Sequence, residues 1–129
     1  MFGKGPGTLC EVARRVNRGE QQFDTAVLEF LDSFYANPEL RLSAIEVRPE
    51  LIDALRDAYL AAVAEHLAKS YRLPVPEWTE TQGNDLHEPF FAGGLETLKG
   101  ILVAESPTAF RRRLLFVSKD ALSRPRQLS

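Results

Sequence analysis

The chain has 129 residues, of which 44% are hydrophobic and 26% are charged. These values are typical of one soluble globular domain, and they exclude a disordered or fibrous chain. We therefore expect a single domain over residues 1–129, with flexible ends at residues 1–6 and 124–129. The one cysteine, Cys10, excludes an internal disulfide and favours a reducing compartment.

No apolar run in the sequence approaches the roughly 20 residues that a membrane-spanning helix requires. The longest apolar run covers only residues 58–64. The start of the chain is rich in glycine and proline and lacks the apolar region of a signal peptide. We therefore expect a cytoplasmic protein without a membrane partner.

The net charge of −2 conceals a division of the chain into blocks of opposite charge. Basic residues exceed acidic ones by three in residues 1–19 and by five in residues 106–129. Acidic residues exceed basic ones by seven in residues 20–65. Such blocks attract a charged partner, each other within one chain, or a second copy of the chain. If they pair within the chain, at least one arginine of residues 111–113 should contact an acid of residues 20–65.

Two amphipathic helices are predicted before Pro38. Thr8 and Glu11 have the spacing of a capping box, and Gly19 ends the short helix that they begin. The second helix ends before Pro38, because the residue that precedes a proline disfavours the helical conformation. Apolar residues recur at helical spacing along its predicted buried face: Phe23, Ala26, Val27, Phe30, Leu31, Phe34 and Tyr35. The acidic residues of the same segment lie off that face: Asp24, Glu29 and Asp32.

A short helix is predicted over residues 38–47, and a long helix over residues 50–71 with Pro49 in its first turn. Alanines make one sector of the long helix narrow, which would let another helix approach closely: Ala58, Ala61, Ala62 and Ala64. The prolines of residues 73–76 force an extended connector after this helix.

Residues 77–94 show no sustained periodicity and contain many turn-forming residues, which predicts a long loop. Apolar side chains are expected to pin this loop: Trp78, Leu86, Phe90 and Phe91. A helix is predicted over residues 95–105, and Ser106 followed by Pro107 is typical of the N-cap of another. Residues 114–117 either continue that helix or form a short extended piece. The pattern predicts an all-α fold of five or six helices with a long loop pinned by aromatic residues.

No residue pattern in the sequence indicates catalysis, a metal site or a cofactor. The three side chains best suited to a metal, Cys10, His66 and His87, are far apart in sequence. We interpret His66 as a half-buried histidine beside a solvated Glu65, and Cys10 as a small packed residue or an exposed thiol. Carboxylates at helical spacing favour a solvated helix face over an acid–base pair: Glu50, Asp53 and Asp57. We therefore expect a non-enzymatic protein without cofactors.

The last third of the chain combines aromatic and basic residues, which are enriched at interfaces. The predicted partner-binding residues are Trp78, Phe90, Phe91, Arg111, Arg112, Arg113, Lys119, Arg124 and Arg126. For Trp78 and Phe90, closure of a small core is an equally good interpretation. The expected partner is another protein or a second copy of the chain. Consecutive helical residues point about 100° apart, so the three adjacent arginines cannot all face one partner.

The alternative function is that of a nucleic-acid-associated regulator. Its phosphate contacts would come from the basic C-terminal segment: Arg111, Arg113, Lys119, Arg124 and Arg126. The isoelectric point near 5.7 is well below that of dedicated nucleic-acid-binding domains, which favours a protein partner.

Four segments have distinctive sequences: residues 73–78 (LPVPEW), 88–91 (EPFF), 105–113 (ESPTAFRRR) and 116–124 (FVSKDALSR). Together they resemble a family of small bacterial helical proteins of unassigned function, over roughly residues 50–126. Members of this family are often linked with toxin–antitoxin or mobile-element loci, so the resemblance implies an antitoxin-like or regulatory component. Relatives sometimes carry a DNA-binding helix–turn–helix before this region, and residues 1–49 do not match one.

Overall fold

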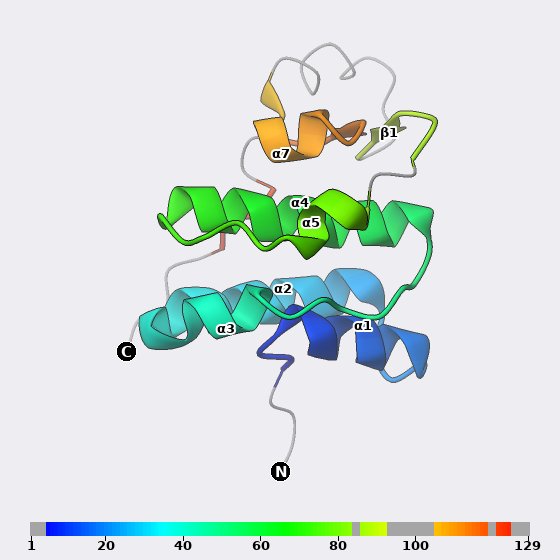
Figure 1. Ribbon diagram of the computed structural model, residues 1–129. Coiled ribbons are helices and arrows are strands. Elements are labelled where there is room, and N and C mark those ends of the chain that lie inside the picture. The colour runs from blue at the N-terminus through cyan, green and yellow to red at the C-terminus, as the bar shows by residue number, and fades with distance from the viewer. Residues whose placement is uncertain (1–4, 84–85, 93–104, 119–120, 125–129) are drawn as a thin grey trace. The chain divides into compact units, whose positions relative to one another are not determined.

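The computed structural model describes residues 5–83, 86–92, 105–118 and 121–124, and α-helices dominate this part of the chain (Figure 1). The predicted all-α fold class is confirmed, with the addition of a small two-stranded sheet. The chain forms two compact units. The N-terminal unit comprises Met1–Ile52 and Ser123–Ser129, and the C-terminal unit comprises Asp53–Leu122. Within the described residues, every helix is too short or too polar to cross a lipid bilayer.

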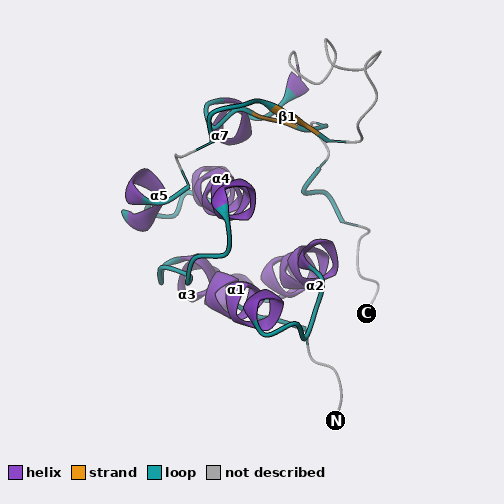
Figure 2. Ribbon diagram, turned by 90° about the vertical axis from the view of Figure 1, so that its right-hand side faces the viewer, coloured by secondary structure: helices purple, strands orange, loops and turns teal. Residues whose placement is uncertain are grey.

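The helices of the N-terminal unit begin and end close to the predicted positions. They are α1 (Leu9–Asn17), α2 (Phe23–Ala36), the 3₁₀ helix η1 (Pro38–Leu40) and α3 (Arg41–Ile45). The predicted N-cap of α1 is confirmed, because the Thr8 hydroxyl accepts the Glu11 N–H at 3.0 Å, while the Glu11 carboxylate accepts the N–H of Gly7, one residue before the cap. Gly19 follows α1 in the left-handed conformation, at φ 71°, as expected of a residue that ends a helix. Helix α1 packs against α2, and α3 packs against both (Figure 2).

The predicted apolar face of α2 is buried. Phe30 and Leu31 have no exposed surface, and Phe34 is 2% exposed. Ala26 and Val27 are buried one turn earlier on the same face. The prediction succeeds because an apolar stripe repeating every three or four residues can only be removed from water on one side of a helix.

Arg41 closes the C-terminal end of α2, where the last carbonyls have no partner inside the helix. Its Nε donates to the Phe34 carbonyl and its Nη2 to the Tyr35 carbonyl, both at 3.1 Å. The guanidinium carbon also lies 5.3 Å from the centre of the Phe34 ring, within the range of a cation–π contact. Arg41 therefore fixes the turn between α2 and α3.

The long helix begins later than predicted, and the placement of Pro49 in its first turn was wrong. Helix α4 spans Ala54–Ser70. Its N-cap is Asp53, which has an extended backbone and accepts the Arg56 N–H at 2.8 Å on its carboxylate. The preceding loop is held by Asn17 of α1, whose amide donates to the Glu50 carboxylate and the Leu51 carbonyl, both at 2.9 Å. These tertiary bonds keep residues 50–52 outside the helix.

Gly83, two residues after α5, approaches the narrow sector of α4 closely. A Cβ atom on Gly83 would lie 2.7 Å from the Ala61 Cβ and 2.7 Å from the Asp57 carbonyl oxygen. Gly83 also has a left-handed backbone, at φ 84°. Of the three carboxylates predicted to be solvated, Glu50 and Asp53 are exposed, but Asp57 is buried. Glu50 precedes the helix, and Asp57 is only 8% exposed.

The long loop predicted over residues 77–94 contains regular structure. Helix α5 (Trp78–Thr81) packs against α4, and strand β1 (Phe90–Phe91) pairs in parallel with β2 (Leu115–Phe116). The Phe90 N–H donates to the Leu114 carbonyl at 2.9 Å. Of the two alternatives for residues 114–117, the extended one is therefore correct. Strands of two residues carry too little periodicity to be recognised in a sequence.

Ser106 is not the N-cap of the helix that follows it. Helix α7 (Thr108–Arg111) begins after Pro107, and its described contacts are with α4 and β2. The buried Ser106 hydroxyl instead accepts the Val117 N–H at 2.8 Å and donates to the Val117 carbonyl at 2.9 Å. This pairing across the C-terminal unit satisfies backbone groups that would otherwise be buried without a partner. The helix predicted over residues 95–105 lies outside the described residues apart from Glu105.

Candidate interaction site

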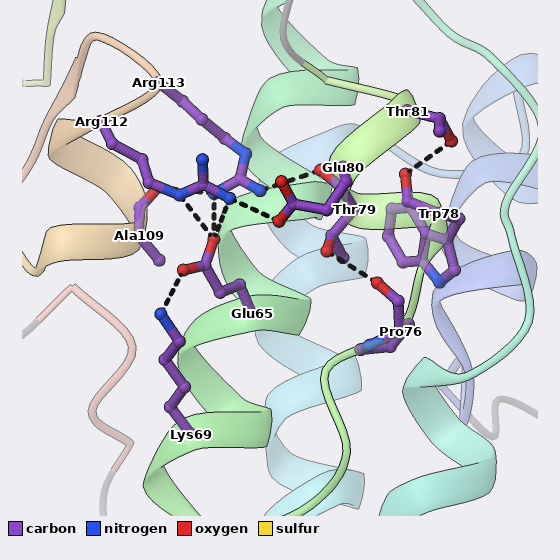
Figure 3. A network of polar contacts seen from close by, with 10 residues as sticks. All are labelled: Glu65, Lys69, Pro76, Trp78, Thr79, Glu80, Thr81, Ala109, Arg112 and Arg113. Atoms are coloured by element: carbon purple, nitrogen blue, oxygen red, sulfur yellow. Dashed lines mark hydrogen bonds and ion pairs between the residues drawn. The ribbon is translucent and has the colours of Figure 1, made fainter.

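The basic run of the sequence converges on one buried carboxylate, that of Glu65 on α4 (Figure 3). Its Oε1 accepts Nη1 of Arg113 at 2.6 Å and Nε of Arg112 at 2.9 Å. Its Oε2 accepts Nζ of Lys69 at 2.7 Å. The predicted pairing between residues 111–113 and an acid of residues 20–65 is thus confirmed. The interpretation of Glu65 as a solvated glutamate was wrong, because its side chain is 2% exposed.

Arg113 is an internal residue of the C-terminal unit. Its side chain has no exposed surface. Besides Glu65, Nη1 donates to the Ala109 carbonyl at 2.8 Å and Nη2 to the Thr79 carbonyl at 3.0 Å. These bonds connect α7 to both α4 and α5 (Figure 3). The guanidinium is therefore not available to a partner, contrary to the predicted role of Arg113 in binding.

Arg112 occupies the edge of the same cluster and bridges two acids. Its Nη2 lies 2.8 Å from Glu65 Oε1 and 2.8 Å from Glu80 Oε2. Its side chain is 37% exposed, whereas that of Arg113 is 0% exposed. Residue Arg111, one position earlier, is exposed. Helix α7 ends at Arg111, and the two arginines that follow it, Arg112 and Arg113, both bond Glu65.

Glu65 is ionised at neutral pH in this environment. Burial raises the pKa of its carboxyl group, but hydrogen bonds from Lys69, Arg113 and Arg112 outweigh burial and lower the pKa from 4.5 to about 2. Burial also lowers the pKa of Arg113. The ordinary pKa of a guanidinium is so far above 7 that this side chain nevertheless stays charged. A carboxylate with a pKa of about 2 that is bonded at both oxygens is unsuited to general acid–base catalysis near neutral pH. The cluster is therefore a structural connection within the C-terminal unit.

The aromatic residues expected to bind a partner divide into buried and exposed ones. Trp78 is 6% exposed and therefore belongs to the core, the alternative interpretation of this residue. The Phe91 ring stacks on that of Phe116, with centroids 5.0 Å apart and planes inclined by 20°. Phe90 is 36% exposed on strand β1. Among the predicted aromatic contacts, Phe90 presents an exposed ring, while Trp78 pins its segment to the core.

The remaining predicted binding residues lie near the end of the chain. Arg124 forms an ion pair with Asp32 of α2, with Nε 2.9 Å from Oδ1. Lys119 and Arg126 lie outside the described residues. Arg113 and Arg124, two of the five arginine and lysine residues assigned to the nucleic-acid alternative, are thus paired with carboxylates of the same chain.

A cleft in the N-terminal unit was not predicted from the sequence. It has a volume of about 770 Å³, and its lining includes Gly5, Gly7 and residues of α1 and α2. Three carboxylates line it, those of Glu11, Glu29 and Asp32. Arg15 is the cation among its lining residues, so the lining carries a charge of −2. We call it the acidic cleft.

Hydrogen bonds hold the side chains of the acidic cleft in place. Glu11 accepts the Gly7 N–H at 3.0 Å on Oε1 and Nη2 of Arg15 at 3.1 Å on Oε2. Glu29 accepts the side-chain amide of Gln21 at 2.7 Å. The sequence signal was present in part, because Glu29 and Asp32 lie three positions apart on the polar face of α2. Their proximity to Glu11 depends on the packing of α1 against α2.

The described residues offer little for metal binding or nucleophilic catalysis. Within them, no three His, Cys, Asp or Glu side chains are grouped as metal ligands. Cys10 donates to the carbonyls of Val47 and Arg48 at 3.3 and 3.4 Å, and burial raises the pKa of its thiol. His66 is half-buried, as predicted, beside the Phe110 ring, and burial lowers its pKa. Cys10 is therefore a packed thiol rather than a reactive thiolate.

No family model, curated protein or solved structure matches the chain. The geometry of the acidic cleft and of the exposed residues around β1 is therefore the basis for inferring a function.

Proposed function

We propose that the chain is a non-enzymatic module that binds another protein, with the acidic cleft as a contact site. The observation that carries this proposal is the excess of carboxylates in a concave site, three against one arginine. Concave sites with a few convergent polar groups are the usual places for ligands. Complementary charge on the partner would increase both the association rate and the selectivity.

The lining of the acidic cleft suits a protein side chain better than a reacting substrate. Ser33 and Asn37 supply polar groups, and Ala36 and Leu40 supply apolar surface. Leu40 is 55% exposed, so it is available for burial under a partner. The mixture of charge, hydrogen-bonding groups and an exposed leucine resembles the composition of a protein interface.

The proposal retains two of the residues predicted from the sequence, Phe90 and Arg111, as contacts on the C-terminal unit. Both are exposed. They are connected by two backbone hydrogen bonds, from Phe90 to the Leu114 carbonyl and from Leu114 to the Arg111 carbonyl, at 2.9 and 3.0 Å. An antitoxin-like regulatory role in the cytoplasm is the biological setting that we propose for this binding.

Affinity capture with matched variants tests the proposal. The bait proteins are the wild-type chain, the cleft variant Glu29→Gln/Asp32→Asn, and the control Asp24→Asn/Glu39→Gln. The control removes two exposed carboxylates that do not line the cleft. We expect one partner to be retained by the wild type and the control and lost by the cleft variant. Retention of the same proteins by all three baits would contradict the proposal.

A nucleic-acid partner would give a different result. Binding of generic duplex DNA that weakens steeply with salt, and that Arg111→Gln reduces, would favour the alternative function. We expect no such binding, because the acidic cleft repels phosphate groups and because Arg113 and Arg124 are paired with carboxylates.

A further inference from the structure

Arg124 and Asp32 are 92 positions apart in the sequence and form a forked ion pair. Nε of Arg124 lies 2.9 Å from Oδ1 of Asp32, and Nη2 lies 3.4 Å from Oδ2. Two parallel contacts of this kind match the planar guanidinium to the planar carboxylate, which a lysine cannot do. Both side chains are partly exposed, at 26% for Arg124 and 33% for Asp32, so the pair can exchange with solvent and with other groups.

Asp32 also lines the acidic cleft, whereas Arg124 is not among the lining residues. The chain therefore places one of its own arginines against the cleft, on a carboxylate that the cleft presents. In this contact the Asp32 carboxylate receives an arginine guanidinium. It also neutralises one of the three cleft carboxylates while it is formed.

We propose that the acidic cleft recognises an arginine-bearing basic segment of the partner protein, and that Arg124 competes with that segment for Asp32. This inference rests on the proposed function of the cleft. Release of Arg124 exposes the full charge of Asp32 to the partner. Arg124 thus acts as an internal competitor that lowers the apparent affinity of the cleft.

The neighbouring groups explain why a segment, rather than a single ion, fits the cleft. The volume of about 770 Å³ exceeds what one guanidinium fills. Glu29, one helical turn from Asp32, has the neutral amide of Gln21 as its hydrogen-bond donor, so a second cation of the segment would be attracted there. Glu11 is partly neutralised by Arg15, at 3.1 Å, and is less suited to a partner. Two basic residues separated by a short spacer therefore match the site.

Fluorescence anisotropy at low ionic strength tests the competition. The probe is a fluorescein-labelled peptide with the sequence of residues 123–129, SRPRQLS, which carries two arginines separated by one residue. Arg124→Gln should bind this probe about two- to five-fold more tightly than the wild type, the range expected from releasing one surface ion pair. Asp32→Asn should bind it more weakly than the wild type. The control Arg18→Gln changes an exposed arginine outside the cleft and should behave as the wild type.

Three results would overturn the inference. Equal affinities of the wild type and Arg124→Gln for the peptide would exclude competition by Arg124. The proposed function would survive that result if the affinity-capture experiment still depended on Glu29 and Asp32. Equal affinity for the lysine peptide SKPKQLS would exclude recognition of the arginine fork. Dimerisation of Arg124→Gln, seen by sedimentation and abolished by Asp32→Asn, would identify a second copy of the chain as the occupant. Circular dichroism of each variant verifies that it is folded.

Discussion

Arg113 donates a 2.6 Å hydrogen bond to Glu65, a residue 48 positions earlier, and both side chains are removed from solvent. The same guanidinium bonds the carbonyls of Ala109 and Thr79. One side chain therefore connects three helices of the C-terminal unit. A buried ion pair of this kind is strongly destabilising when one partner is removed, because the other charge stays buried.

Replacing Arg113 by alanine should lower the free energy of unfolding by about 3–5 kcal/mol, because Glu65 would remain buried with fewer cationic partners. Urea denaturation followed by circular dichroism measures this change. The control Arg111→Ala changes an exposed arginine two positions earlier. It should change the free energy of unfolding by about 0.5 kcal/mol or less. Similar effects of the two substitutions would show that the buried pair does not stabilise the fold.

The stability of the chain should fall in acid through Glu65. The pKa of this carboxyl is about 2 in the folded chain, below its ordinary value of 4.5. A carboxyl with a depressed folded pKa contributes stability that is fully present above its unfolded pKa and is lost as the pH falls through the folded one. The loss should therefore occur between pH 4.5 and about 2. Urea midpoints of the wild type and Glu65→Gln between pH 7 and pH 2 should converge towards the acid end, and parallel curves would contradict this prediction.

Gly83→Ala should destabilise the chain by about 2–4 kcal/mol, because it combines overpacking with a left-handed backbone. The added Cβ would lie 2.7 Å from the Asp57 carbonyl oxygen, which cannot move without distorting α4. Gly19→Ala is a matched control, since Gly19 is also left-handed but has nothing within 4 Å of its Cβ position. Gly19→Ala should lower the free energy of unfolding only by the cost of placing alanine in a left-handed backbone, about 1 kcal/mol. Thermal and urea unfolding of both variants separate crowding from conformation.

Phe30→Ala should lower the free energy of unfolding by about 3–5 kcal/mol, because it empties a site in a packed core. Phe30 has no exposed surface, and its ring lies 6.0 Å from that of Phe34. Leu28→Ala, on the same helix but 38% exposed, should have a much smaller effect. A loss below about 1 kcal/mol for Phe30→Ala would show that the apolar face of α2 does not stabilise the unit.

Sequence patterns predicted the elements that obey local rules. The Thr8 cap and the apolar stripe of α2 involve residues within a few positions of one another, and both are confirmed. The start of α4 was misplaced because Pro49 suits a first helical turn by local rules. The bonds from Asn17 to Glu50 and Leu51 hold these residues in a loop, and the helix begins after Asp53.

Charge blocks along the sequence allowed basic residues near the end of the chain to pair with acids of the middle, with a partner or with a second copy. They could not indicate which acids, because opposite charges attract at any separation along the chain. Glu65 and Asp32 receive these arginines since the packing of α7 and of the last described residues brings them within hydrogen-bond distance.

The sequence alone therefore determined the helical fold class and the buried face of α2, and it left internal charge pairing as one of three alternatives. The tertiary structure decided which arginines are buried, how closely Gly83 approaches α4, and where three carboxylates form a cleft. The physical reason is the range of the interactions. Helical periodicity and capping act within one or two turns, whereas pairing and clefts depend on contacts between residues far apart in the chain.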